Sequence, residues 1–172
     1  SMGEHLISHY IDMFMGDKHP GSLHGEQVGI ATLFVSKIQN DVLQDSKVPE
    51  FQEINHHLDN FEIIFGNEIA NQLHKQFKNK LFSKNSLQEV NKKLNDNWQN
   101  YKNILLNHSI DTKIIKNSFL KCGAACTNIE LGISNKFYKT AIENAHLLRD
   151  RFSYLDIMHY LKLSDKYSNI IG

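Results

Sequence analysis

Residues 3–43, GEHLISHYIDMFMGDKHPGSLHGEQVGIATLFVSKIQNDVL, carry the pattern that decides the fold. Apolar side chains recur at helical spacing over residues 3–15, a turn rich in helix breakers covers Asp17–Ser22, and helical spacing resumes over Gly25–Leu43. The pattern therefore predicts two helices joined by a short turn. The residues expected on one side of the second helix are Val28, Thr32, Val35 and Ile38.

Helical spacing also fills most of the remaining chain, and no stretch shows the sustained alternation of a half-buried strand. We therefore predict a single all-α domain over residues 1–172. The further helices expected are one over residues 51–65, one capped by Asn67, a long one capped by Ser86, one from Asp111 to Gly123, one capped by Ser134 and a last one beginning at Ser153.

The amino-acid composition indicates which classes of binding partner to expect. Lysine plus arginine and aspartate plus glutamate both total 19, so the net charge of zero gives no electrostatic reason to expect nucleic acid or an anionic membrane surface. No apolar run of about 18 residues occurs, which predicts no membrane span. No secretory signal opens the sequence, so we expect a cytoplasmic protein. Cys122 and Cys126, placed on one helical turn, are expected to be reduced thiols.

Three of the ten histidines form the informative group. His5 and His9 lie four residues apart, which puts both imidazoles on one face of a helix, about 6 Å apart. His24 follows the turn, and a helix hairpin can bring it back beside that face. Neutral imidazoles favour zinc, nickel or iron(II), and a catalytic site normally needs a third protein ligand. Spacing alone leaves a metal site and an incidental surface pair as open alternatives.

Other polar residues receive structural interpretations. Glu26 is expected to be a carboxylate at a helix N-terminus rather than a ligand. Gly25 either prevents crowding of the metal helix or contacts a substrate. Gly25 and Gly29 together indicate that another segment closely approaches this helix. Arg149 and Arg151 are expected to pair with carboxylates or terminal carbonyls, outside the site. The histidines expected to be structural or exposed are His19, His56, His57, His74, His108, His146 and His159.

Two sequence blocks resemble a known superfamily. Gly3-Glu4-His5-Leu6-Ile7-Ser8-His9 and Leu23-His24-Gly25-Glu26-Gln27-Val28-Gly29-Ile30 resemble the paired histidine motifs of the dehydroquinate synthase and iron-containing alcohol dehydrogenase superfamily. The residues of these two motifs are most similar to those of the sn-glycerol-1-phosphate dehydrogenases. Residues 127–134 (TNIELGIS) and 148–156 (LRDRFSYLD) look like the C-terminal end of the same family, whereas residues 45–120 match only as generic helices.

The resemblance implies a fold and a set of roles. The chain would be the multi-helix C-terminal domain of that superfamily, with His5 and His24 as metal ligands and His9 facing the substrate. No residue is assigned a catalytic role. The third ligand of the family, an aspartate, and its glycine-rich nucleotide loop belong to an N-terminal nucleotide-binding domain that has no counterpart here. Ser1 and Met2 are interpreted as cloning residues ahead of an excised domain.

The implied reaction interconverts dihydroxyacetone phosphate and sn-glycerol 1-phosphate with NAD(P)H in the full-length enzyme. The metal would be zinc, with nickel or iron as alternatives, and a homo-oligomer is compatible with the family. The isolated domain is expected to be inactive. Two rival interpretations remain: a dehydroquinate-synthase-like reaction or another polyol substrate, and a non-enzymatic helical interaction domain.

Overall fold

The computed structural model describes residues 2–54 and 58–168, and every regular element in these ranges is helical, which confirms the all-α class. None of the described helices is long and apolar enough to cross a membrane. The elements in chain order are α1 (Gly3–Phe14), the 3-10 turn η1 (Gly16–Lys18), α2 (His24–Gln44), α3 (Leu58–Phe65), α4 (Asn67–Lys78), α5 (Lys84–His108), α6 (Thr112–Cys122), α7 (Asn135–Asn144), the 3-10 turn η2 (Ala145–Leu148), α8 (Tyr154–Tyr160) and α9 (Ser164–Ser168).

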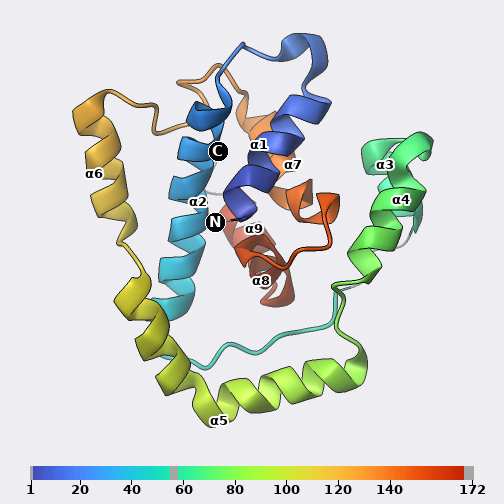
Figure 1. The fold of residues 1–172 in the computed structure, drawn as a ribbon, viewed down its shortest axis with the longest axis vertical. Coiled ribbons are helices and arrows are strands. Elements are labelled where there is room, and N and C mark those ends of the chain that lie inside the picture. Colours follow the sequence, from blue (N-terminus) through green and yellow to red (C-terminus); the bar gives the residue numbers. More distant parts are fainter. Residues whose placement is uncertain (1, 55–57, 169–172) are drawn as a thin grey trace.

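The hairpin of α1 and α2 lies at the centre of the fold (Figure 1). The C-terminal elements α7, η2 and α8 return to this hairpin and pack against it. The middle of the chain surrounds this hairpin. Helices α3 and α4 lie at one edge of the fold, α5 passes beside the end of α2, and α6 runs back along α2. The two sequence blocks that carry the family resemblance therefore meet in space, although more than a hundred residues separate them.

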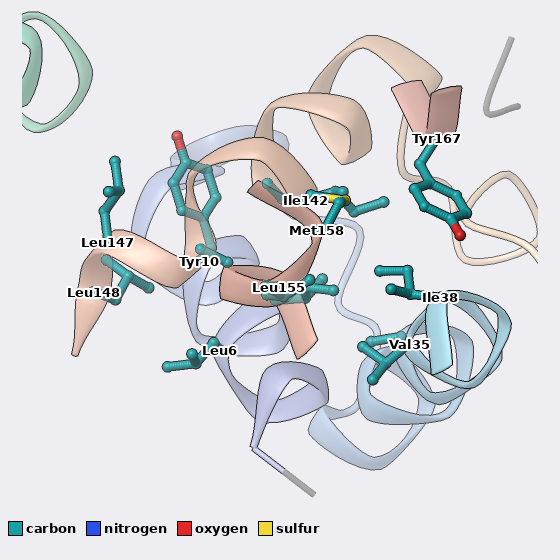
Figure 2. Close-up of a cluster of buried hydrophobic side chains, with 14 of the residues drawn as sticks. Leu6, Tyr10, Val35, Ile38, Ile142, Leu147, Leu148, Leu155, Met158 and Tyr167 are labelled. Carbon is teal, nitrogen blue, oxygen red and sulfur yellow. The ribbon is translucent and has the colours of Figure 1, made fainter. Parts of the chain in front are cut away.

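The core forms where α8 packs against the hairpin of α1 and α2 (Figure 2). Leu155 and Met158 of α8 are fully buried, with Tyr10 of α1 on one side and Val35 and Ile38 of α2 on the other. Removing each such side chain from water contributes about 1.5–3 kcal/mol to folding. This packing fixes the relative positions of the helices that carry the histidines.

Glycines permit two tight features of the hairpin. At Gly21 the backbone has φ of +76°, a conformation that side-chain-bearing residues rarely adopt, and the chain turns there towards α2. At Gly3 a Cβ atom would lie 3.3 Å from Leu155 Cγ and 3.3 Å from Val35 Cγ2. The start of α1 therefore sits directly on α2 and α8 because position 3 lacks a side chain.

The helix expected over residues 51–65 is only partly correct. Residues 51–54 are not helical, and α3 begins at Leu58. The backbone N–H of Phe51 donates to Asn91 Oδ1 (2.8 Å), and the Asn91 amide donates back to the Phe51 carbonyl (2.8 Å). The side chain of a distant helix thus satisfies the backbone groups that a local helix would otherwise pair.

The cap predictions had mixed outcomes. Asp111 and Ser134 each accept a backbone N–H at the start of their helices, as predicted. Ser153, which was expected to be the first residue of its helix, is instead the N-cap of α8. The predicted cap at Ser86 is wrong, because Ser83 accepts the N–H of Ser86 and α5 begins earlier. The predicted cap at Asn67 is also wrong, since Asn67 is already the first residue of α4. The short helix α9 was not predicted.

Candidate metal centre

His5 and His24 face each other across the helix hairpin. Nδ1 of His5 lies 3.2 Å from Nε2 of His24, and the two ring centroids are 5.3 Å apart. His5 projects from the first turn of α1, and His24 is the first residue of α2, directly after the turn. The expectation that the hairpin brings His24 beside the face of His5 is therefore confirmed as geometry.

His9 lies on the same face, one helical turn further along α1. Its ring centroid is 5.6 Å from that of His24, and its side chain is exposed. Burial lowers the pKa of His9, and the positive charges of His24, Arg149 and His5 lower it further, against the opposing charge of Asp12. The His9 imidazole is therefore held in its neutral form at neutral pH, able both to donate and to accept one hydrogen bond.

The His5 and His24 nitrogens fit two positions of one metal. Zinc–nitrogen bonds of about 2.0–2.1 Å at a tetrahedral angle separate two ligand nitrogens by roughly 3.3–3.4 Å. The observed separation of 3.2 Å is close to that value. Within residues 2–54 and 58–168, no group of three or more His, Cys, Asp or Glu side chains is arranged to hold a metal ion. The described residues thus offer a pair of ligands, and a complete site would need more.

A chain of hydrogen bonds runs inward from the pair. Ser8 Oγ lies 2.8 Å from His24 Nδ1 and donates to Gln27 Oε1 at 2.6 Å. Gln27 Nε2 donates to Asp12 Oδ1 at 3.0 Å. Ser8 and Gln27 are both 0% exposed, although both are polar. Each buried polar group needs a partner, and this chain supplies one to each of them.

His19 forms the outer end of this chain. Its Nδ1 accepts the backbone N–H of Gly21 (3.1 Å), and its Nε2 lies 3.2 Å from Asp12 Oδ1 and 2.9 Å from Gln27 Nε2. His19 was predicted to be structural or exposed. It is half-buried and contacts Asp12 and Gln27, two residues of the chain of hydrogen bonds behind His24.

Arg149 also lies close to the histidine face, which the sequence prediction missed. It lines a small notch beside His9, together with Met13 of α1 and Leu73 of α4. Arg149 was expected to pair with a carboxylate or a terminal carbonyl, and among the described residues it forms no ion pair with a carboxylate. An exposed, uncompensated guanidinium beside a neutral imidazole is suited to binding an anionic group.

The other sequence assignments can be placed around this centre. Glu26 Oε2 accepts the N–H of Leu23 (2.8 Å), as expected of a carboxylate at a helix N-terminus. A Cβ at Gly25 would meet nothing within 4 Å, so the crowding interpretation of Gly25 is wrong. A Cβ at Gly29 would lie 3.4 Å from the ring of Phe119, which makes α6 the segment that approaches α2 there.

The remaining histidines and cysteines lie elsewhere. His146 and His159 stack with ring centroids 3.8 Å apart, and His74 packs on Phe61 at 5.0 Å, which agrees with structural roles. His108 is exposed, and His56 and His57 lie outside the described residues. Both cysteines are free thiols, but they do not share a helical turn, because α6 ends at the left-handed Gly123 between them.

Comparison with known proteins adds no assignment. No protein family matches the chain, and no curated protein or solved structure shows significant similarity to it.

Proposed function

We propose that this chain is the metal-site domain of an oxidoreductase that interconverts dihydroxyacetone phosphate and sn-glycerol 1-phosphate with NAD(P)H. The observation that carries the proposal is the 3.2 Å approach of His5 Nδ1 and His24 Nε2, from the two motifs that resemble the glycerol-1-phosphate dehydrogenases. In this proposal His5 and His24 are two of the ligands of a divalent metal, zinc first, with nickel or iron as alternatives.

The residue types suit the reaction. When bound, a divalent metal would stabilise the negative charge that develops on the ketone oxygen as hydride is added. His9, one turn from His5 and neutral at neutral pH, would hydrogen-bond a hydroxyl group of the substrate. In this role His9 positions the substrate without binding the metal.

Arg149 extends the proposal to the substrate phosphate. The phosphate of dihydroxyacetone phosphate is carried by the carbon next to the ketone, so its binding group should lie beside the metal rather than at it. Arg149 lines the notch beside His9 and forms no ion pair with a carboxylate among the described residues. Arginine binds phosphate oxygens through paired N–H donors.

The proposal needs groups that this sequence does not provide. Its 172 residues contain no Gly-x-Gly-x-x-Gly motif, so a nucleotide-binding domain must hold NAD(P)H and supply the third ligand. Hydride transfer would then occur in the cleft between that domain and the histidine face. We accordingly propose that the isolated chain binds metal weakly and does not turn over substrate.

Zinc titration of this chain by calorimetry tests the metal assignment. Structural zinc sites with four ligands contribute about 10–16 kcal/mol, so a two-ligand site should contribute roughly half, with a Kd on the order of 1–100 µM. His5→Ala and His24→Ala should each abolish the binding. His108→Ala, which removes an exposed histidine far along the chain, should leave it unchanged. Nanomolar zinc binding that survives His24→Ala would refute the assignment.

The substrate is tested in a longer protein that joins this chain to a nucleotide-binding domain. NADH-dependent reduction of dihydroxyacetone phosphate, lost in His24→Ala, is the expected result. Preference for an unphosphorylated polyol would favour the rival substrate class. An absence of any metal-dependent redox activity would favour the helical interaction domain.

A further inference from the structure

We propose that Asp12, acting through Gln27 and Ser8, is a positioning group that holds His24 as the Nδ1–H tautomer and leaves its Nε2 lone pair directed at the site. The metal-affinity part of this inference rests on the proposed function, whereas the tautomer itself does not. The inference follows from the direction of each hydrogen bond in the buried chain behind His24, which is fixed step by step by chemistry.

The first step is the orientation of the Gln27 amide. The carboxylate of Asp12 can only accept hydrogen bonds, and so can the backbone carbonyl of Ser22. The same end of the Gln27 amide lies 3.0 Å from Asp12 Oδ1 and 3.3 Å from the Ser22 carbonyl oxygen. We assign that end as the NH₂ group, because the reverse orientation would bring three acceptor oxygens together, and these two acceptors outweigh the one opposing contact, His19 Nε2 at 2.9 Å. The Gln27 carbonyl oxygen consequently faces Ser8.

The second step is the proton of Ser8. A serine hydroxyl donates one hydrogen bond, and Gln27 Oε1 at 2.6 Å is a pure acceptor. The Ser8 proton is thereby committed to Gln27. The remaining contact of Ser8 Oγ, at 2.8 Å to His24 Nδ1, must then be one in which His24 donates. A neutral His24 with its proton on Nδ1 carries its lone pair on Nε2.

The third step connects this tautomer to the site. Nε2 of His24 is the atom that lies 3.2 Å from His5 Nδ1, so the lone pair points between the two imidazoles. Ligation requires a free lone pair on the ligand nitrogen, and a hydrogen bond to the other ring nitrogen fixes which nitrogen carries it. Asp12 Oδ2 also lies 3.8 Å from His24 Nδ1, and its negative charge favours a proton at that nitrogen.

Burial makes the arrangement rigid. Ser8 and Gln27 are 0% exposed, so water cannot replace a missing partner, and reversing one bond would leave a buried group unsatisfied. Asp12 at the outer end is exposed, with 43% of its side chain accessible. A charged surface carboxylate thus imposes one direction on two buried neutral groups and, through them, on the ligand.

The test uses two buried variants and a matched control. Ser8→Ala removes the acceptor of His24 Nδ1–H, and Gln27→Met removes the amide with little change in volume. Ser36→Ala removes another buried serine of the same hairpin, which bonds the Leu33 carbonyl and Thr112 rather than His24. Thermal unfolding of all three proteins accounts for any general loss of stability.

Nitrogen-15 NMR of the imidazole rings, at a pH where His24 is neutral and without metal, reads the tautomer directly. The wild-type protein and Ser36→Ala should show a protonated Nδ1 and an unprotonated Nε2 at His24. Ser8→Ala and Gln27→Met should shift the population towards Nε2–H and weaken zinc binding by about 10–100-fold. A wild-type His24 protonated at Nε2, or an unchanged tautomer in Ser8→Ala, would overturn the inference.

The proposed metal site and the proposed positioning role of Asp12 can be refuted independently of each other. If the wild-type chain has the Nδ1–H tautomer but binds no zinc at His5 and His24, the positioning role stands and the metal site of the proposed function falls. If zinc binds at His5 and His24 and Ser8→Ala leaves its Kd unchanged, the metal site stands. The contribution of the Asp12–Gln27–Ser8 chain of hydrogen bonds to zinc affinity is then refuted.

Discussion

His5 and His24 stand 19 residues apart in the sequence, yet their ring nitrogens Nδ1 and Nε2 lie 3.2 Å apart across the turn between α1 and α2. The pair is held by packing rather than by the turn alone. α1 and α2 each bury apolar side chains against α8, with Leu155 and Met158 between them (Figure 2).

The pKa of His9 should lie below the ordinary histidine value of about 6.5, because burial and the positive charges of His24, Arg149 and His5 all disfavour its protonated form. An NMR titration of the His9 ring measures it. Arg149→Gln should raise the pKa, since one positive charge is removed. A pKa that is unchanged in Arg149→Gln would show that the arginine does not act on His9.

The lowered pKa of His9 also predicts how the free energy of unfolding changes with pH. A lowered folded-state pKa means that the unfolded chain binds this proton more readily, so His9 lowers the free energy of unfolding as the pH falls below about 6.5. His9→Gln, which cannot be protonated, should therefore lose less stability than the wild-type protein between pH 7.5 and pH 5.5. Urea unfolding at both pH values measures the difference. An equal loss in the two proteins would contradict this sign.

The buried ion pair of Lys80 and Asp156 should be essential for the attachment of α4. Lys80 Nζ lies 2.7 Å from Asp156 Oδ1 and also donates to the carbonyl of His146, with the two side chains 4% and 1% exposed. Lys80→Met should lower the free energy of unfolding by about 3–5 kcal/mol, because it leaves a buried carboxylate without its cation. Chemical denaturation checks this value.

The double variant Lys80→Met/Asp156→Ala controls for that interpretation. Its loss in free energy of unfolding should be smaller than the sum of the losses in the two single variants, because each single change leaves the other charge buried without its partner. Additive losses in the cycle would mean that the pair is not coupled.

Two glycines of the histidine motifs should respond in opposite ways to alanine. Gly3→Ala should destabilise the chain by about 1–3 kcal/mol, because the new Cβ would lie 3.3 Å from Leu155 and from Val35. Gly25→Ala meets no atom within 4 Å and should be neutral or stabilising by up to about 1 kcal/mol, through helix propensity. Thermal unfolding distinguishes the two. Unchanged zinc affinity in Gly25→Ala is also expected, and a loss would revive the crowding interpretation.

This chain alone should not oxidise NADH in the presence of dihydroxyacetone phosphate, with or without added zinc, since its sequence provides no nucleotide loop. Absorbance at the NADH band measures the rate, with His24→Ala as the blank. A rate above that blank would contradict the division of the active site between two domains.

Much of the architecture could be predicted from periodicity, because long helices with clear caps leave a strong local signal. The hairpin and the caps at Asp111 and Ser134 are such cases. Residues 51–54 could not be predicted, since a partner 40 residues away, Asn91, pairs the backbone of Phe51. The start of α5 was predicted three residues too late, because Ser83 rather than Ser86 accepts the backbone N–H there.

Part of the histidine site could also be predicted from local sequence. The His5–His24 pairing follows from helix phase and the turn. Helix phase could also have identified Ser8 and Asp12, which lie three and seven residues after His5 and therefore share its face. The position of Arg149 carried no such signal, because it depends on how η2 and the segment after it pack against α1.

The most direct test of the central claim is anomalous scattering at the zinc edge from crystals of this chain soaked in zinc. The account predicts one principal peak between the two imidazoles, about 2.0–2.1 Å from His5 Nδ1 and from His24 Nε2. It also predicts that the peak disappears in His24→Ala. A principal peak at another site, such as the free thiols of Cys122 and Cys126, with none between His5 and His24, would contradict it.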